Sequence, residues 1–441
     1  MFISSKVLLV YGVLISSIFG STTALAANCP VLPNVSHYQQ TQQWLELLEQ
    51  WLPQQSNCLR SSRYFSLIGA AQLNLGQLST AQLSLERALL LDADNGSAML
   101  DYSQVLFNQG QLFAAIDLNQ QLQRRADLPS YLSALLQERA TAWQSLTRRH
   151  STELAISGGY NSNLNNAPDL QTLEVTIDGQ PGHLTLSERS QEIGGAQSNI
   201  ILTQRYDWSS AERQQQLSLT LDGRRSHDTD SDLQRVTAQY ISRSQQYNGT
   251  IEWDGRVNYV HFGGKALYSD SEIGSRFDWN GDGNHSCRPL LKGRLTYRHF
   301  YQDDNSDGAI LALGGGFNCN LGNGLLSMSL EQVENIAIRE RAGDDRRGPR
   351  LELQWQQPLL RGQFSSALQL SYNQDSAGYS TLLNNNEKRH ILFSKLQFNY
   401  RQPIHKDLAW TLAASVGEQR SNLELFEQQS RRLDLGLEWR F

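Results

Sequence analysis

The sequence predicts a two-domain α+β protein, with an N-terminal α-helical domain and a C-terminal transmembrane antiparallel β-barrel of fourteen strands. Three observations predict this fold. The chain begins with an export signal, its hydrophobic pattern changes from helical to alternating near residue 150, and it ends on an alternating apolar strand. The expected segments are a signal peptide at 1–26, the helical domain at 27–150 and the barrel at 151–441.

The first 26 residues are typical of a secretory signal peptide. Lys6 gives the positive start, residues 7–19 are apolar, and Ala24-Leu25-Ala26 is a small-residue cleavage site. The apolar stretch is too short for a good membrane-spanning helix. An asparagine precedes Cys29, where a lipoprotein signal requires a small residue, so we do not expect lipidation there.

Helical periodicity extends from Val35 to about Arg149 and includes an internal repeat. Leu75-Gly76-Gln77-Leu78 recurs 34 residues later as Gln109-Gly110-Gln111-Leu112, and Ala81 recurs as Ala115. This period, with glycine at the turn and alanine in the second helix, resembles the tetratricopeptide repeat. We expect repeats over 62–129 with capping helices at 37–56 and 129–148; a generic helical bundle is the alternative.

The remainder of the chain alternates between apolar and polar residues, as in the segment from Leu351 to Trp355. Fourteen strands are predicted to begin near residues 153, 196, 214, 232, 249, 268, 287, 308, 324, 349, 363, 388, 407 and 431. The connections that follow even-numbered strands are short, whereas most of the others are longer and rich in Asp, Asn, Gly and Ser. Short periplasmic turns and longer external loops are typical of outer-membrane barrels. The longest connection, 164–195, is expected to be functional or disordered.

The final strand gives the clearest evidence for a membrane barrel. Apolar residues from Leu433 to Phe441 alternate with polar residues or glycine, so one face is suited to lipid and the other to a wet lumen. Leu437, Trp439 and Phe441 resemble the sorting signal that the barrel assembly machinery reads. We therefore expect the barrel to contact lipid of a Gram-negative outer membrane, with the helical domain in the periplasm. A soluble β-sandwich is the alternative.

Four cysteines in an exported chain favour disulfides. Cys29 and Cys58 flank the first helix, and Cys287 and Cys319 lie at the same rim of one predicted hairpin. Local pairing of each couple is one of three connectivities, and free thiols are the alternative. No Cys-x-x-Cys or clustered histidine pattern indicates a metal site.

Catalytic motifs are not evident, so we expect neither an enzyme nor a cofactor. The sequence contains no Gly-x-Ser-x-Gly, phosphate loop or His-Glu-x-x-His. The acidic pairs Asp303-Asp304 and Asp344-Asp345 fit solvated turns better than paired catalytic acids. A net charge of -6, without a basic stripe, gives no indication of a nucleic-acid partner.

The combined architecture resembles the surface lipoprotein assembly modifiers, also called the translocons of the type XI secretion system. The segment 159–168, at the outer end of the first predicted strand, resembles the way the barrels of that family open. This resemblance implies an outer-membrane translocon. Its cargo would be exported proteins, either surface lipoproteins or secreted haem- and metal-binding proteins.

In such a translocon, the repeats would bind or orient cargo, and the barrel would give a lumenal conduit or a lateral exit. The first helix of each repeat should form the concave face, so Tyr64, Ile68, Tyr102 and Leu106 are cargo-contact candidates or ordinary packing residues. The competing functions are an exopolysaccharide-export porin with a tetratricopeptide domain and a passive outer-membrane channel.

Overall fold

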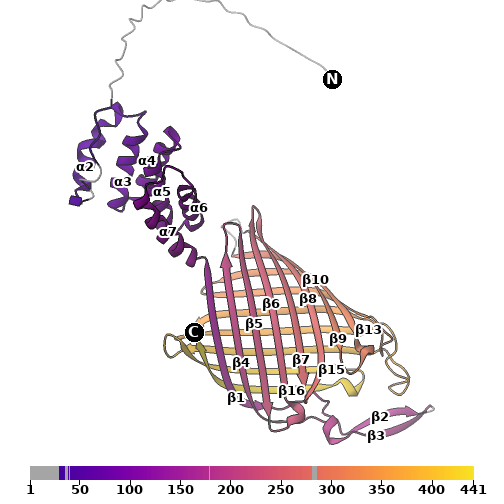
Figure 1. Ribbon diagram of the computed structural model, residues 1–441. Coiled ribbons are helices and arrows are strands. Elements are labelled where there is room, and N and C mark those ends of the chain that lie inside the picture. The colour runs from indigo at the N-terminus through magenta and orange to yellow at the C-terminus, as the bar shows by residue number, and fades with distance from the viewer. Residues whose placement is uncertain (1–28, 35–37, 39, 178, 281–285) are drawn as a thin grey trace, which may run out of the picture. The chain divides into compact units, whose positions relative to one another are not determined.

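The computed structural model describes residues 29–34, 38, 40–177, 179–280 and 286–441, so the predicted signal peptide lies outside the described residues. The chain divides into two compact units, Met1–Trp143 and Gln144–Phe441, which are helical and β respectively (Figure 1). Among the described residues, no helix combines the length and apolarity needed to cross a membrane.

The helical unit repeats every 34 residues. The first helices of successive pairs begin at Ser62, Gly96 and Ser130, so the predicted capping helix at 129–148 begins one period after the second repeat. The predicted helix at 37–56 is interrupted, because Pro53 lacks an amide hydrogen and the chain continues as a 3-10 turn. The described helices are α2 Trp44–Trp51, η1 Leu52–Asn57, α3 Ser62–Asn74, α4 Leu78–Leu91, α5 Gly96–Asn108, α6 Leu112–Gln123 and α7 Ser130–Ser145.

Both repeats begin with the same capping interaction. The side chain of Ser61 accepts a hydrogen bond from the amide of Tyr64 at 3.2 Å. One period later, Asn95 accepts from the amide of Ala98 at 3.0 Å. These side chains satisfy amides that the first turn of a helix leaves without a partner, so they fix where α3 and α5 start.

The turns inside the repeats explain the recurring glycines. Gly76 and Gly110 have φ angles of +72° and +79°, in the left-handed region that favours glycine. Ala81 and Ala115, at the start of each second helix, are fully buried. Their small side chains allow the paired helices to approach closely, and the prediction of a tetratricopeptide-like domain is confirmed.

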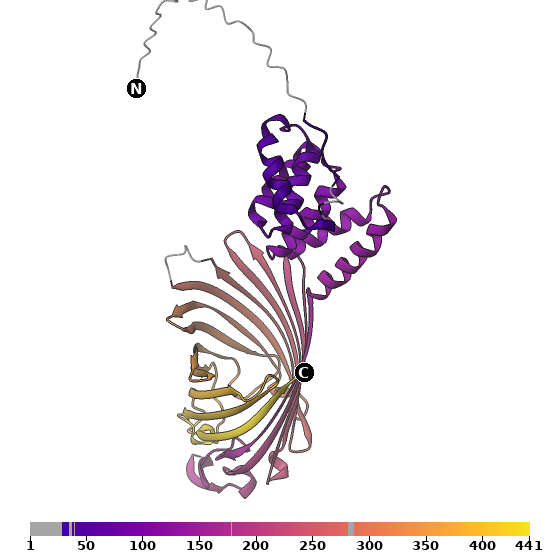
Figure 2. The same ribbon diagram turned by 90° about the vertical axis from the view of Figure 1, so that its left-hand side faces the viewer.

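The β unit is a closed barrel (Figure 2). It has fourteen antiparallel strands, and β1 pairs with both β4 and β16. The predicted fold class is confirmed, and each strand begins within five residues of its predicted start. The barrel strands are β1 Arg148–Asn161, β4 Gly195–Ser209, β5 Arg213–Ser226, β6 Leu233–Gln246, β7 Gly249–Phe262, β8 Lys265–Trp279, β9 Cys287–Phe300, β10 Gly308–Leu321, β11 Gly324–Ala337, β12 Arg346–Leu359, β13 Gly362–Asp375, β14 His390–Pro403, β15 Leu408–Ser421 and β16 Gln428–Arg440.

The longest connection is not a simple loop. It contains a hairpin of β2 (Thr172–Ile177) and β3 (Gln180–Thr185), which form a separate two-stranded sheet. Figure 1 shows this hairpin beyond the ends of the barrel strands. Leu173, Val175 and Ile177 alternate with polar residues in β2. That alternation is typical of a strand, but a segment of only six residues is too short for the pattern to predict one by itself.

The two faces of the barrel wall differ as the final strand predicted. Leu433 and Leu435 are 56% and 61% exposed on the outer face, whereas Asp434 between them is 3% exposed. An apolar outer band and a polar interior are the features of a transmembrane barrel. The closed fourteen-stranded barrel is therefore an outer-membrane barrel, as predicted.

Candidate functional site

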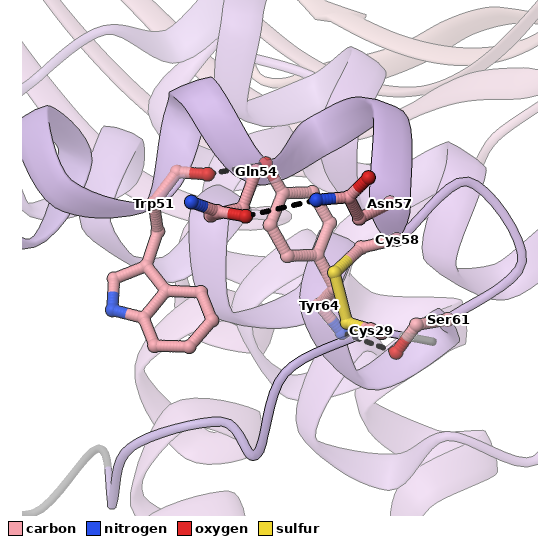
Figure 3. Close-up of a disulfide and its surroundings, with 7 residues drawn as sticks. All are labelled: Cys29, Trp51, Gln54, Asn57, Cys58, Ser61 and Tyr64. Carbon is pink, nitrogen blue, oxygen red and sulfur yellow. Dashed lines mark hydrogen bonds between the residues drawn. A yellow bond between two sulfur atoms is a disulfide. The ribbon is translucent and has the colours of Figure 1, made fainter. Parts of the chain in front are cut away.

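Of the two disulfides, one lies in the helical unit and closes the start of the repeat array. Cys29 is bonded to Cys58, which is almost fully buried just before α3 (Figure 3). The hydroxyl of Tyr64 donates to the carbonyl of Trp51 at 2.8 Å, and the Asn57 side chain donates to that of Gln54 at 3.0 Å. These contacts fasten the chain before the repeats against α3.

The second disulfide joins Cys287 and Cys319, which face each other in the register of β9 and β10. It lies at the end of the barrel where the short turns occur, next to the connection between β8 and β9. Both cysteine couples therefore form the predicted local pairs, and neither supplies a free thiol.

The four cargo-contact candidates lie in the interior of the helical unit. Tyr64, Ile68 and Leu106 are buried at 1%, 2% and 5% exposure. Tyr102 is half-buried, and its hydroxyl donates to a carboxylate oxygen of Glu86 at 2.7 Å. In this conformation all four residues pack between helices, which was the second of their two interpretations.

A titratable group that the sequence analysis missed lies between α5 and α7. Burial raises the pKa of Asp101 to about 7, and the positive charge of Arg139 opposes that rise. The Arg139 guanidinium donates to the carbonyl of Leu100 at 3.3 Å and lies 5.7 Å from the centre of the Trp143 ring. Asp101 thus changes its charge near neutral pH where α5 packs against α7. Sequence spacing alone gave no signal for it, because the contact depends on how α5 packs on α7.

One wall of the barrel lumen carries paired charges. Lys292 on β9 extends across β10 to Glu331 on β11, at 2.6 Å, and to Glu352 on β12, at 3.3 Å. It passes over Gly314, which is the register partner of both Lys292 and Glu331. A Cβ atom at Gly314 would lie 2.1 Å from the carbonyl oxygen of Leu330. The absence of a side chain at Gly314 therefore allows close packing here.

The same wall contains a second ionic group around Glu272. This carboxylate lies 3.4 Å from Arg256 on β7 and 3.5 Å from Arg294 on β9. A cavity of about 230 Å³ borders this wall, and its lining includes four cationic residues and four carboxylates. The charges there balance, so the wall is polar but has little net charge. The cavity's charged lining residues are Glu252, Asp254, Arg256, Arg276, Lys292, Arg294, Glu331 and Glu352.

The opposite wall has fewer charged side chains. It borders a larger cavity of about 680 Å³ between β12–β16, β1, β4 and β5. Many of the lining side chains are small or carry an amide, which leaves space in the lumen. Examples are Ala155, Ser157, Ser365, Asn399, Ala413 and Ser415.

Three outer connections are held together by an apolar group that we call the outer-rim cluster: Leu173, Leu383, Leu423, Tyr379 and Phe426. These residues come from β2, the β13–β14 connection and the β15–β16 connection. The amide of Thr176 in β2 also donates to the carbonyl of Leu382, at 2.8 Å. The connections on this side of the barrel therefore form a folded structure with its own core.

A buried ion pair anchors the outer-rim cluster. The Arg389 guanidinium lies 4.5 Å from the centre of the Tyr379 ring and 4.3 Å from that of Phe426. It also lies 3.1 Å from the Asp375 carboxylate, and both side chains are at most 4% exposed. Breaking such a pair leaves a charge without compensation, so the pair favours the closed arrangement of these connections.

The barrel closes between β1 and β16, and this seam is fastened at both ends. At the short-turn end, the Phe441 amide donates to the Thr152 carbonyl at 2.8 Å, and the Thr152 amide donates back at 3.2 Å. At the other end, the Ser162 amide donates to the Arg431 carbonyl at 2.9 Å. Leu437 and Trp439 of the predicted sorting signal pair with β1 in between.

No group of three or more metal-binding side chains occurs in the part of the chain that the structure describes. The two acidic pairs instead accept hydrogen bonds that hold their own connections. Asp303 accepts hydrogen bonds from the Ser306 hydroxyl at 2.6 Å and the Asn305 amide at 3.3 Å. Asp345 accepts from the Ala337 amide at 2.7 Å, which agrees with the interpretation of these residues as turn-forming.

No family model and no curated protein matches the chain. Among solved structures, the outer membrane channel DcaP of Acinetobacter baumannii is 6% identical, with 67% of this chain and 98% of that chain covered and a TM-score of 0.37. OccAB4 of the same organism is 10% identical, with 66% and 98% covered and a TM-score of 0.35. The Yersinia enterocolitica type III secretion chaperone SycD, in complex with a translocator peptide, is 18% identical, with 25% and 87% covered and a TM-score of 0.24.

These likenesses are too distant to assign an activity. The architecture rests on the strand order, the register and the 34-residue helical period of the chain itself. The chain is a fourteen-stranded outer-membrane β-barrel that carries a tetratricopeptide-like helical unit before its first strand.

Proposed function

We propose that the chain is an outer-membrane translocon that moves specific cargo proteins from the periplasm to the cell surface. The cargo would be surface lipoproteins or secreted haem- and metal-binding proteins, as in the surface lipoprotein assembly modifiers. The observation that carries this proposal is the direct covalent link between the two units. Only residues 146–147 separate the last helix of a repeat unit from the first strand of a barrel with a polar lumen. Stacked helical repeats create binding surfaces, which a passive channel does not need.

Chain topology supports a periplasmic location for the helical unit. β1 begins at the barrel end where the alternate turns are short, and short turns are periplasmic in bacterial outer-membrane barrels. The helical unit is attached directly to that end. It would therefore meet exported proteins before they reach the membrane.

Exposed positions of the helical unit are better contact candidates than the four buried or packed ones. Leu83 and Leu90 are 67% and 80% exposed on α4. Their spacing of seven residues places them on one face of the helix. We propose that this apolar face contributes to cargo binding.

The lumen supports passage of an extended polypeptide. Eight-stranded barrels are filled by their own side chains, whereas barrels of sixteen or more strands leave an aqueous channel. Fourteen strands lie between these limits, and small side chains widen one wall. The fastened seam between β1 and β16 favours this lumenal route over the lateral exit.

The lining of the lumen disfavours polysaccharide export. Sugar-guiding walls rely on aromatic side chains, but Tyr206 and Tyr240 are exposed on the outer face of the barrel, 39% each. The described lining of the two lumen cavities is dominated by charged, amide and small side chains. Tyr400 is the one aromatic residue in the described linings, so such walls provide polar contacts but little stacking surface for sugar rings.

A comparison of surface proteins with and without this gene tests the proposal. Intact native cells would be shaved with protease and analysed by mass spectrometry, with total protein levels measured in parallel and the gene restored as a control. We expect one or two proteins to vanish from the surface or medium while persisting inside the cell. Unchanged surface proteins together with altered capsule or solute uptake would replace this proposal with the exporter or the passive channel.

A further inference from the structure

The larger lumen cavity carries an excess of positive charge. Its lining includes four cationic residues, Arg224, Lys395, Arg401 and Arg432, but only two carboxylates, Asp434 and Glu438. The smaller cavity on the opposite wall has four of each. A positive excess in a confined polar space attracts anions. The two cavities of the same lumen therefore differ in electrostatic character.

Both carboxylates of the larger cavity are already engaged. Asp434 pairs with Arg432 and also accepts hydrogen bonds from Gln197, at 2.8 Å, and Asn199, at 3.3 Å. Glu438 lies 2.7 Å from Arg401 and 3.1 Å from Arg440. Neither carboxylate forms an ion pair with Lys395 or Arg224, and so the excess charge resides on these two side chains.

Lys395, like Lys292, extends past a glycine on the neighbouring strand, but it has no carboxylate with which to form an ion pair. Its stem passes Gly417 on the neighbouring strand, where a Cβ atom would lie 3.9 Å from the Lys395 Cγ atom. The next residue in that row is Ser430, rather than a counterpart of Glu331. No carboxylate of the described residues lies within ion-pair distance of Lys395, and Arg432 repels it.

Arg224 completes the group near the outer end of β5. One terminal nitrogen of its guanidinium donates to the carbonyls of Leu164, at 2.8 Å, and Ser231, at 2.5 Å. These contacts hold the side chain in place without neutralising it. Its Nε atom is buried and has no hydrogen-bond partner among the described residues. Arg432 repels Lys395 and also repels Arg224, whose charge Asp232 and Asp222 offset in part without forming an ion pair, so one anion placed among the three would relieve both repulsions.

We propose that Arg224, Lys395 and Arg432 form an oxyanion-binding site in the outer half of the lumen. Its ligand is a small solute carrying a phosphate or carboxylate group. Charge-assisted hydrogen bonds from guanidinium and ammonium groups recognise both chemistries. Amide and hydroxyl groups of Asn399 and Ser430 line the same cavity, of about 680 Å³, and add polar contacts to the site. The site stands independently of the proposed protein export.

Equilibrium dialysis of the full-length protein in uncharged detergent with labelled inorganic phosphate tests this site. We expect saturable binding that Lys395→Gln and Arg224→Gln each weaken by about tenfold or more, because each removes a charged donor. Lys292→Gln is the matched control, since it removes a lysine that crosses a glycine on the charge-balanced wall. Its phosphate affinity should equal that of the wild type.

Competition distinguishes the two ligand chemistries. Displacement of phosphate by succinate identifies a general oxyanion site, whereas phosphate binding that succinate does not reduce identifies a phosphate site. Heat-modifiable gel migration would establish that every variant contains a folded barrel. Absence of saturable binding of either anion, or equal weakening by Lys292→Gln and Lys395→Gln, would overturn the proposal.

Discussion

Truncation of Leu423 tests whether the outer-rim cluster holds the outer connections closed. Leu423 is 2% exposed and packs in the cluster with Leu173 and Leu383. Replacing a buried leucine with alanine costs about 2–5 kcal/mol. Because each 1.4 kcal/mol is tenfold, a loss of about 3 kcal/mol would raise the open population of these connections roughly a hundredfold.

Trypsin added to intact cells measures that opening. Arg389 is enclosed by Tyr379 and Phe426, so the bond after it is protected while the cluster is closed. Peptide mapping would measure the rate of cleavage at this bond. When opening is rapid, that rate tracks the open population, so cleavage should be roughly a hundredfold faster in Leu423→Ala. The control is Leu382→Ala on the β13–β14 connection, which also carries Arg389; the Leu382 side chain is 51% exposed and its loss should change little. Equal cleavage rates in the two variants would refute the reasoning.

Three further predictions concern the lumen wall and the helical unit. Gly314→Val should prevent barrel assembly, seen as loss of heat-modifiable migration, because its Cβ would lie 2.1 Å from a backbone oxygen; Gly255→Ala, with 4.0 Å available, should assemble normally. The pKa of Asp101 is raised to about 7, so over the range from about pH 4 to about pH 7 the folded state binds more protons than the unfolded state. The helical unit should therefore lose stability, on the order of 4 kcal/mol, as the pH rises through that range. Hydrogen exchange in α5–α7, corrected for its intrinsic pH dependence, should therefore accelerate over that range, and Asp101→Asn should abolish the acceleration. Reducing Cys29–Cys58, which spans 29 residues, should cost the helical unit roughly 3.5 kcal/mol; an unchanged thermal transition by circular dichroism with reductant would count against a stabilising role.

Features encoded by local periodicity were predictable from the sequence. The alternation that ends with Leu435, Leu437 and Trp439 identified the lipid face, because successive strand side chains point to opposite sides. The 34-residue recurrence around Gly76 and Gly110 identified the repeats, because only a few residue types tolerate that turn. The residues at which the strands begin were also predicted closely, because turn residues interrupt the alternation.

Features that depend on packing between distant segments were not predictable. Lys292 meets Glu352 across two intervening strands and 60 residues, and this pairing depends on register that no local pattern specifies. The choice between cargo contact and ordinary packing was left open for Tyr64 and Ile68 for a similar reason. Helical spacing places these two residues on one face of α3, but it does not say whether a neighbouring helix covers that face, and both are buried.

Cross-linking from the lumen tests the translocation claim most directly. A photoreactive amino acid would replace Ser415, which lines the larger lumen cavity, or Val416, the next residue on β15, which is 53% exposed on the outer face. In living cells that export surface proteins, we predict a discrete adduct with an exported protein from position 415 and none from position 416. Adducts from neither position, or equal adducts from both, would contradict passage of cargo through the barrel.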